Sequence, residues 1–146
     1  MKRFLCPALF IASFTVLASG AQADVANFEA KCTWNAGNTT FTCEFDSTRP
    51  TSNPTACGNS LAPQYRWTYG DGSSSPSSAG TYGFSSKPNH TYASPPPGVF
   101  GYVAKLKIRC FQSANPESYT YAEIERYICV FGLGSPGCIH VDGNWY

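Results

Sequence analysis

The chain has 146 residues, of which 15% are aromatic and 13% are charged. This length favours a single domain, because one core usually organises on the order of 100–200 residues. Ten basic and nine acidic residues give a formal net charge of +1. The chain therefore lacks the basic field that holds a phosphate backbone, and nucleic acid is not an expected partner.

The first 23 residues resemble an export signal. Two basic residues precede an apolar run that reaches Leu17, and Ala21-Gln22-Ala23 supplies the small residues that signal peptidase needs. The run is shorter than the about 20 residues of a membrane span. We therefore expect a signal peptide over residues 1–23, a mature chain without a membrane span, and a secreted or periplasmic location.

Six of the seven cysteines belong to the mature chain, because Cys6 lies in the signal. An even number of cysteines in a small exported domain indicates disulfides. A metal site is disfavoured, because no Cys-x-x-Cys pair occurs and the only histidines, His90 and His140, stand far apart in sequence. We expect neither a metal nor a cofactor. The six cysteines are Cys32, Cys43, Cys57, Cys110, Cys129 and Cys138.

Apolar and polar residues alternate in several stretches of the mature chain, which is typical of strands with one face in a core. The first two stretches, residues 30–34 and 41–45, flank turn residues and predict a hairpin. Pro-containing residues 47–63 predict a long loop. After them we expect a strand over 65–69, a flexible connection or hairpin tip over 73–78, a weak strand over 81–84, a Pro-rich turn over 94–98, a strand over 100–110, a turn at Asn115-Pro116 and a long strand over 119–131.

These stretches together predict an all-β fold. Seven or so short strands in about 120 residues favour an antiparallel sandwich of two sheets. A barrel built from the same strands is the alternative that composition leaves open. We expect the sandwich to span residues 24–131, followed by a C-terminal tail over residues 132–146.

The run Gly70-Asp71-Gly72 predicts a tight turn at the end of a strand. The two glycines permit backbone angles that are closed to other residues, and Asp71 can accept hydrogen bonds from nearby amides. A phosphate cradle or a calcium loop would need a lysine or further carboxylates at set spacing, and the sequence has neither there. Trp67, just before the turn, is expected to lie buried at the centre of the sandwich.

Three motifs in order resemble the polycystic kidney disease (PKD) domain family. They are Tyr65-Arg66-Trp67-Thr68-Tyr69-Gly70-Asp71-Gly72, then His90-Thr91-Tyr92, then Gly98-Val99-Phe100-Gly101-Tyr102 with alternating apolar residues after it. The resemblance covers about residues 39–131, although Thr68 stands where the family usually has Asp. It implies an immunoglobulin-like β-sandwich in a non-catalytic extracellular module for protein or carbohydrate contact or for spacing. The structural motif residues would be Trp67, Gly70, Asp71, Gly72, His90 and Tyr92.

Six cysteines permit 15 disulfide pairings. In an immunoglobulin-like sandwich we favour Cys32–Cys43 across the first hairpin, Cys57–Cys110 at one end of the sandwich, and Cys129–Cys138 around a short loop. The competing arrangement joins Cys43 to Cys110 beside the buried tryptophan, as in antibody domains, and leaves Cys32 to pair with Cys57.

His90 is the residue that most suggests catalysis. A nucleophilic site would pair it with a serine and an orienting carboxylate, or with a free thiol. The sequence has no Gly-x-Ser-x-Gly elbow, and its thiols are expected to be oxidised. We therefore expect His90 to be satisfied by main-chain atoms near the start of a strand, and the chain not to be an enzyme.

The remaining interpretation is a binding module at or outside the cell envelope, whose partner is a protein or a polysaccharide. Exposed aromatic residues give a large contact area at a small entropic cost. Core packing, or a tail docked on the sheet, is the alternative role for the same residues. The alternative function is a secreted inhibitor of a protease or other hydrolase that presents the loop Thr48–Pro63. The candidate contact residues are Tyr119, Tyr121, Trp145 and Tyr146.

Overall fold

The structure is a computed structural model that describes residues 25–51, 55–58, 63–114, 117–130 and 137–146. The expected signal over residues 1–23 and the expected turn at Asn115-Pro116 lie outside these ranges. Within them the regular elements are all strands. None of the described residues forms a helix long and apolar enough to cross a membrane.

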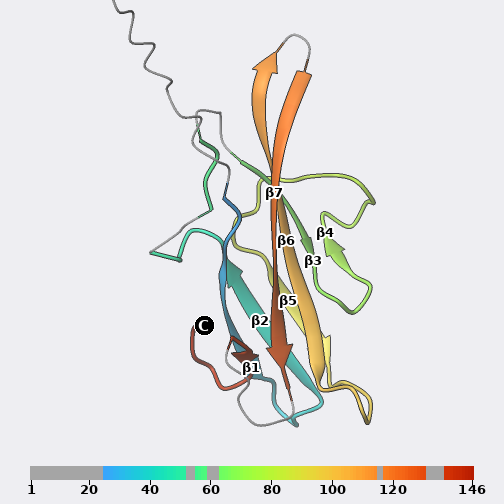
Figure 1. Cartoon of the computed structure of the whole chain (residues 1–146). Coiled ribbons are helices and arrows are strands. Elements are labelled where there is room, and N and C mark those ends of the chain that lie inside the picture. The colour runs from blue at the N-terminus through green and yellow to red at the C-terminus, as the bar shows by residue number, and fades with distance from the viewer. Residues whose placement is uncertain (1–24, 52–54, 59–62, 115–116, 131–136) are drawn as a thin grey trace, which may run out of the picture.

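In the described part of the chain, eight strands form two sheets that pack face to face (Figure 1). The smaller sheet has the order β1-β2-β5 and the larger has the order β4-β3-β6-β7-β8. Neighbouring strands are antiparallel except for β7 and β8. The all-β, disulfide-stabilised sandwich expected from the sequence is confirmed. The strands are β1 Glu29–Trp34, β2 Thr40–Asp46, β3 Gln64–Thr68, β4 Ser74–Ser75, β5 Asn89–Ala93, β6 Gly101–Ala114, β7 Glu117–Cys129 and β8 Ile139–His140.

The β6–β7 hairpin is the longest pairing, and it runs from Gly101 opposite Cys129 to Ala114 opposite Glu117. Inward positions such as Leu106 are fully buried, whereas outward positions on β7 such as Tyr121 and Tyr127 are exposed. Gly101 is required by the close approach of the two strands, because a Cβ there would lie 1.8 Å from the carbonyl oxygen of Ile128. The alternating pattern of the sequence is therefore the pattern of burial.

The core between the sheets is aromatic. Trp67 on β3 is 1% exposed, as the sequence predicted. Its ring centroid lies 5.2 Å from that of Phe28 and 5.6 Å from that of Phe45, both from the N-terminal part of the chain. The indole N–H donates to the carbonyl oxygen of Ser85 at 3.0 Å, so burying this large side chain leaves no unsatisfied donor.

The weak strand expected over residues 81–84 is wrong. Only Gly83 pairs with β3, in a single bridge to Tyr65, and the neighbouring Phe84 is 74% exposed. The strand that continues the sheet is instead β4, which pairs with Trp67 and Thr68 and lies within the serine-rich segment. The chain reaches β4 through the glycine turn and returns past Gly80, whose φ is +74°.

The cysteines form the disulfides Cys32–Cys43, Cys57–Cys110 and Cys129–Cys138. This is the pairing that we favoured, and not the one that joins Cys43 to Cys110. Cys32 and Cys43 are directly opposite each other in the β1–β2 ladder, so the hairpin register itself brings them together. Cys57 reaches Cys110 from the long loop, part of which pairs with Val25 through Ala56.

The disulfides should stabilise the fold more when they close a longer stretch of chain, although the effect grows only with the logarithm of the length. Cys57–Cys110 closes 53 residues and Cys32–Cys43 closes 11, and the loop entropy removed from the unfolded chain grows with length. We expect the variant Cys57→Ala/Cys110→Ala to lose about 4 kcal/mol of unfolding free energy, and Cys32→Ala/Cys43→Ala about 3 kcal/mol. Urea unfolding of both variants measures these losses, and the reverse order would contradict the argument.

Candidate functional site

The outer face of the five-stranded sheet carries rings and charges in cross-strand pairs. On β6 and β7, the outward positions pair as Lys105 with Glu125, Lys107 with Glu123, and Arg109 with Tyr121. Tyr121 is 54% exposed. Side chains opposite each other on one face of a sheet contact directly, so this face presents an ordered row of groups to solvent.

A tyrosine–arginine cluster, made of Tyr82, Arg109, Tyr119 and Tyr121, lies at one end of this row. The guanidinium carbon of Arg109 is 4.6 Å from the ring centroid of Tyr82 and 4.5 Å from that of Tyr119. The Arg109 Nε–H donates to Gln64 Oε1 at 2.6 Å. The centroids of Tyr82 and Tyr121 are 6.2 Å apart. The guanidinium thus contacts two rings, while its own hydrogen bond fixes it to β3.

Tyr82 reaches the cluster because the loop before it is tied to β3. Gly83 and Tyr65 exchange two main-chain hydrogen bonds, of 2.7 and 2.8 Å. The Arg66 guanidinium donates to the carbonyl oxygens of Ser78 and Thr81, at 2.9 and 3.1 Å. These contacts hold the loop beside the sheet. Tyr82 itself belongs to no strand, so the position of its ring depends on the bonds of its loop to Tyr65 and Arg66.

The two lysines next to the cluster are paired with glutamates. Lys105 pairs with Glu125, and Lys107 Nζ lies 3.6 Å from Glu123. Burial raises the pKa of the Tyr82 hydroxyl, so at neutral pH this group is protonated and can both donate and accept. The face therefore offers ring surfaces and hydrogen-bonding groups, together with the positive charges of Arg66 and Arg109, whose guanidinium groups donate to neutral oxygens.

The glycine turn has the tight geometry that the sequence predicts. Gly70 and Gly72 have φ values of +83° and +93°. A Cβ at Gly70 would lie 2.5 Å from the Val103 carbonyl oxygen, so only glycine fits where the turn meets β6. The Asp71 carboxylate accepts a hydrogen bond from the Ser73 amide at 2.9 Å.

His90, Asp71 and Ser73 meet at this turn, but not in the geometry of a catalytic triad. His90 Nε2 lies 2.7 Å from Asp71 Oδ2, and the same nitrogen lies 3.2 Å from Ser73 Oγ. A carboxylate only accepts hydrogen bonds, so the proton lies on Nε2, which then cannot take one from serine. A triad instead places the serine and the carboxylate on opposite ring nitrogens. The contacts of His90 with Asp71 and Ser73 link β5 to the glycine turn.

The expectation that main-chain atoms satisfy His90 is therefore wrong. The residue does lie near the start of β5, but the Asp71 and Ser73 side chains bind its ring. The ring of Tyr69 stacks on it with centroids 4.0 Å apart. Tyr92 packs edge-on at 4.5 Å and is fully buried. The PKD-like motif residues thus form a packed junction between β3 and β5.

Trp145 and Tyr146 lie at the edge of the smaller sheet, away from the tyrosine–arginine cluster. Tyr146 exchanges two main-chain hydrogen bonds of 3.1 Å with Ala30 on β1. The guanidinium carbon of Arg49 is 4.3 Å from the Trp145 ring centroid. Arg126 on β7 donates to the Tyr146 carbonyl oxygen at 3.0 Å. For these two residues the docked tail, which the sequence left open, is what the structure shows.

The four candidate contact residues thus separate into two pairs. Tyr119 and Tyr121 belong to the outward cluster, whereas Trp145 and Tyr146 dock on β1, and Tyr146 is also bound by Arg126 of β7. Sequence reasoning missed Tyr82 and Arg109. Arg109 could have been found from the sequence, because it occupies an outward position of the strand with the clearest alternation. Tyr82 lies in a segment whose sequence shows no such pattern. Among the described residues, no group of three or more His, Cys, Asp or Glu side chains could hold a metal ion.

No family model, curated protein or solved structure matches the chain. The PKD resemblance therefore depends on the three sequence motifs, and the interpretation of the surface depends on its own geometry.

Replacing Asp71 should change how stability depends on pH. Burial raises the pKa of the carboxyl, but the contacts with Ser73 and His90 outweigh it, and the pKa lies below its usual 3.8. A lowered pKa stabilises the fold above the unfolded-state value, and this contribution is lost as the pH falls through the folded-state value. We expect Asp71→Asn to cost about 1 kcal/mol at pH 7, and the difference from wild type to shrink in acid. Urea unfolding between about pH 7 and pH 2 tests this; a constant difference would contradict it.

Removing the Trp145 ring should destabilise the fold. The ring packs against Arg49 and Lys31, with the Lys31 Nζ 5.7 Å from its centroid. Loss of these contacts and of the covered apolar area should lower the unfolding free energy by about 1–2 kcal/mol. Thermal unfolding of Trp145→Ala gives the measurement, and an unchanged midpoint would show that the tail is not held by its ring.

Proposed function

We propose that the chain is an exported, non-catalytic contact module that binds its partner through the outer face of the five-stranded sheet. The observation that carries this proposal is the stack of Tyr82, Arg109 and Tyr119 beside the exposed ring of Tyr121. Tyrosine and arginine are the residue types that most often dominate binding energies. The partner would be a protein or a polysaccharide at or outside the cell envelope.

The cluster is suited to binding because it is ordered before any partner arrives. Arg109 is fixed by Gln64 and by two rings, and Tyr82 is fixed by the Arg66 tether. Side chains that are already ordered lose little conformational entropy when they bind. Rings with hydroxyl groups also serve two chemistries at once, since they cover apolar surface and exchange hydrogen bonds.

A polysaccharide fits this surface better than a protein does. A sugar ring has an apolar face of C–H groups and a rim of hydroxyls, which match an aromatic ring bordered by hydrogen-bonding side chains. The neighbouring charges are already paired as Lys105–Glu125 and Lys107–Glu123, so they supply hydrogen bonds without demanding a charged ligand. The PKD resemblance supports the same class of function.

The alternative, an inhibitor of a protease or other hydrolase, would present the loop Thr48–Pro63. The described part of that loop is fixed to the sandwich, by the Cys57–Cys110 disulfide and by the bridge between Val25 and Ala56. Its exposed arginine, Arg49, pairs with Glu29 and contacts Trp145. Anchoring alone would suit an inhibitory loop; what does not favour the inhibitor is that Arg49 is engaged by its own protein.

Removing one exposed ring of the cluster should weaken partner binding. We expect the mature protein, residues 24–146 with disulfides intact, to be retained by cell-envelope polysaccharides, and Tyr121→Ala to lower the affinity about tenfold. Tyr121 is exposed, so the variant should remain folded by circular dichroism. The measurement is a depletion isotherm on the retaining polysaccharide.

The control is Trp145→Ala, which removes a ring that packs beside β1 of the smaller sheet. The variant should be less stable but still folded by circular dichroism at the assay temperature, and its affinity should be unchanged. Equal loss in both variants would contradict the assignment of the outer face. Inhibition of a protease or glycosidase that survives Tyr121→Ala, without polysaccharide binding, would favour the inhibitor instead.

A further inference from the structure

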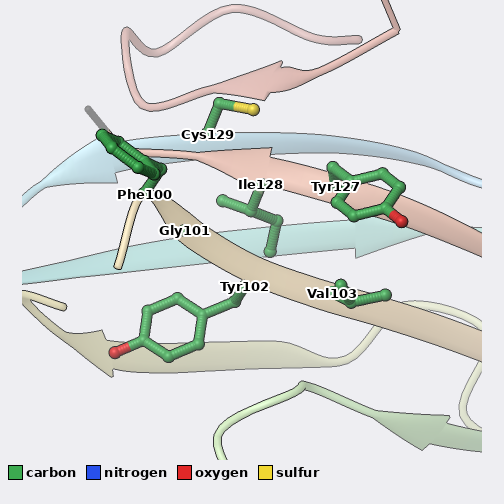
Figure 2. A pocket seen from close by; sticks show the side chains of 7 residues that line it. All are labelled: Phe100, Gly101, Tyr102, Val103, Tyr127, Ile128 and Cys129. Carbon is green, nitrogen blue, oxygen red and sulfur yellow. The ribbon is translucent and has the colours of Figure 1, made fainter. Parts of the chain in front are cut away.

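An apolar hollow lies at the other end of β6 and β7 (Figure 2). It has a volume of about 180 Å³, and Phe100, Val103 and Tyr127 are among the residues that line it. Phe100 is 70% exposed and Tyr127 is 62% exposed. Two large rings left this open on a small domain indicate a contact site rather than core packing.

The hollow and the tyrosine–arginine cluster share one face of one hairpin. Val103 pairs with Tyr127, and Arg109 pairs with Tyr121, in the same continuous register. Tyr121 and Tyr127 are six residues apart on β7, and every second residue of a strand points to the same side. At about 3.4 Å per residue, the two ring sites are about 20 Å apart along the strand.

The surface between the two ring sites is polar and electrically paired. Lys107–Glu123 and Lys105–Glu125 lie there, in consecutive outward pairs of the ladder. Each lysine faces a glutamate, so these two pairs supply hydrogen-bonding groups and no net charge, while Arg66 on β3, opposite Lys107, adds one positive charge beside them. A strongly charged polymer would have to break these pairs to bind, whereas an uncharged polymer with hydroxyl groups would not.

The main chain of β6 is not available to a peptide strand. β6 pairs with β3 on one side and with β7 on the other, so its N–H and C=O groups are used within the sheet. An extended peptide gains most of its affinity from such groups when it adds to a sheet edge. A ligand that lies on the face over β6 is therefore contacted by side chains only, which favours one that stacks on rings and offers hydroxyls; the edge of β7 differs, since among the described residues it pairs with β8 only through Ile128 and Cys129.

We infer that the two ring sites are subsites for one extended, uncharged polysaccharide chain that lies along β6 and β7. One part of the chain contacts the tyrosine–arginine cluster, a middle part crosses the paired charges, and another part contacts the hollow. This inference deepens the proposed function and depends on it. Its added content is the second subsite, the direction of the ligand and the need for a chain of several sugar residues.

The inference predicts a dependence on ligand length. Two linked contacts bind more tightly than either alone, because the second becomes intramolecular once the first has formed. A disaccharide cannot span about 20 Å, so it reaches one subsite only. The probes are cellohexaose, xylohexaose, chitohexaose and maltohexaose with their disaccharides, and the dissociation constants are measured by isothermal titration calorimetry on the mature protein.

At least one hexasaccharide should bind about tenfold more tightly than its disaccharide. Tyr127→Ala should remove this advantage, and Tyr127→Phe, which keeps the ring, should retain it. Phe100→Ala tests the same subsite from its other side. Because both side chains are exposed, circular dichroism should show all three variants folded.

Three results would overturn the inference. If no hexasaccharide binds, or if only an anionic polymer such as polygalacturonate binds, the uncharged polysaccharide is the wrong ligand. If a hexasaccharide binds and Tyr121→Ala weakens it while Tyr127→Ala does not, the second subsite is wrong and the proposed function stands. If Tyr121→Ala changes binding to neither polysaccharides nor secreted proteins, the proposed function fails as well.

Discussion

The register of the β6–β7 ladder is the constraint on which the rest of the structure depends. Side chains alternate between the two faces of a strand, so a slip of one residue would exchange the core face for the solvent face. In the observed register Leu106 lies in the core beside Trp67, its partner on β3. The same register places Tyr121 opposite Arg109 on the outside. The pairing of β6 with β7 therefore determines both which side chains form the core and which side chains lie on the outer face.

Much of the fold could be predicted because the long strands show their burial in the sequence. The strand predicted over residues 100–110 is β6, Gly101–Ala114, and the strand predicted over 119–131 is β7, Glu117–Cys129. β4 and β8 have two residues each, which is too short for an alternating pattern. Each of them forms because it pairs with the edge of a longer strand. Their formation therefore depends on residues that are distant in sequence, which a local pattern does not show.

The site was harder to predict because its parts come from different segments. Residue type alone predicts Tyr119, Tyr121 and Trp145 as contact residues, yet in the structure the two tyrosines face outward whereas Trp145 is held against Arg49. Tyr82 depends on the tether from Arg66 across its loop. The residues of the glycine turn show the opposite limit. Asp71, Ser73 and His90 do meet, but Asp71 and Ser73 both contact Nε2 of His90. This arrangement links β5 to the turn and is not that of a catalytic triad.

The direction of the β6–β7 ladder also determines how the domain responds to force. The hydrogen bonds of an antiparallel pair are perpendicular to the strands. When opposite forces act on β6 and β7 parallel to the strands, they load all the hydrogen bonds between the two strands at once. Forces perpendicular to the strands would instead break these bonds one after another. Tension applied along the hairpin therefore meets the mechanically stronger axis of the sheet.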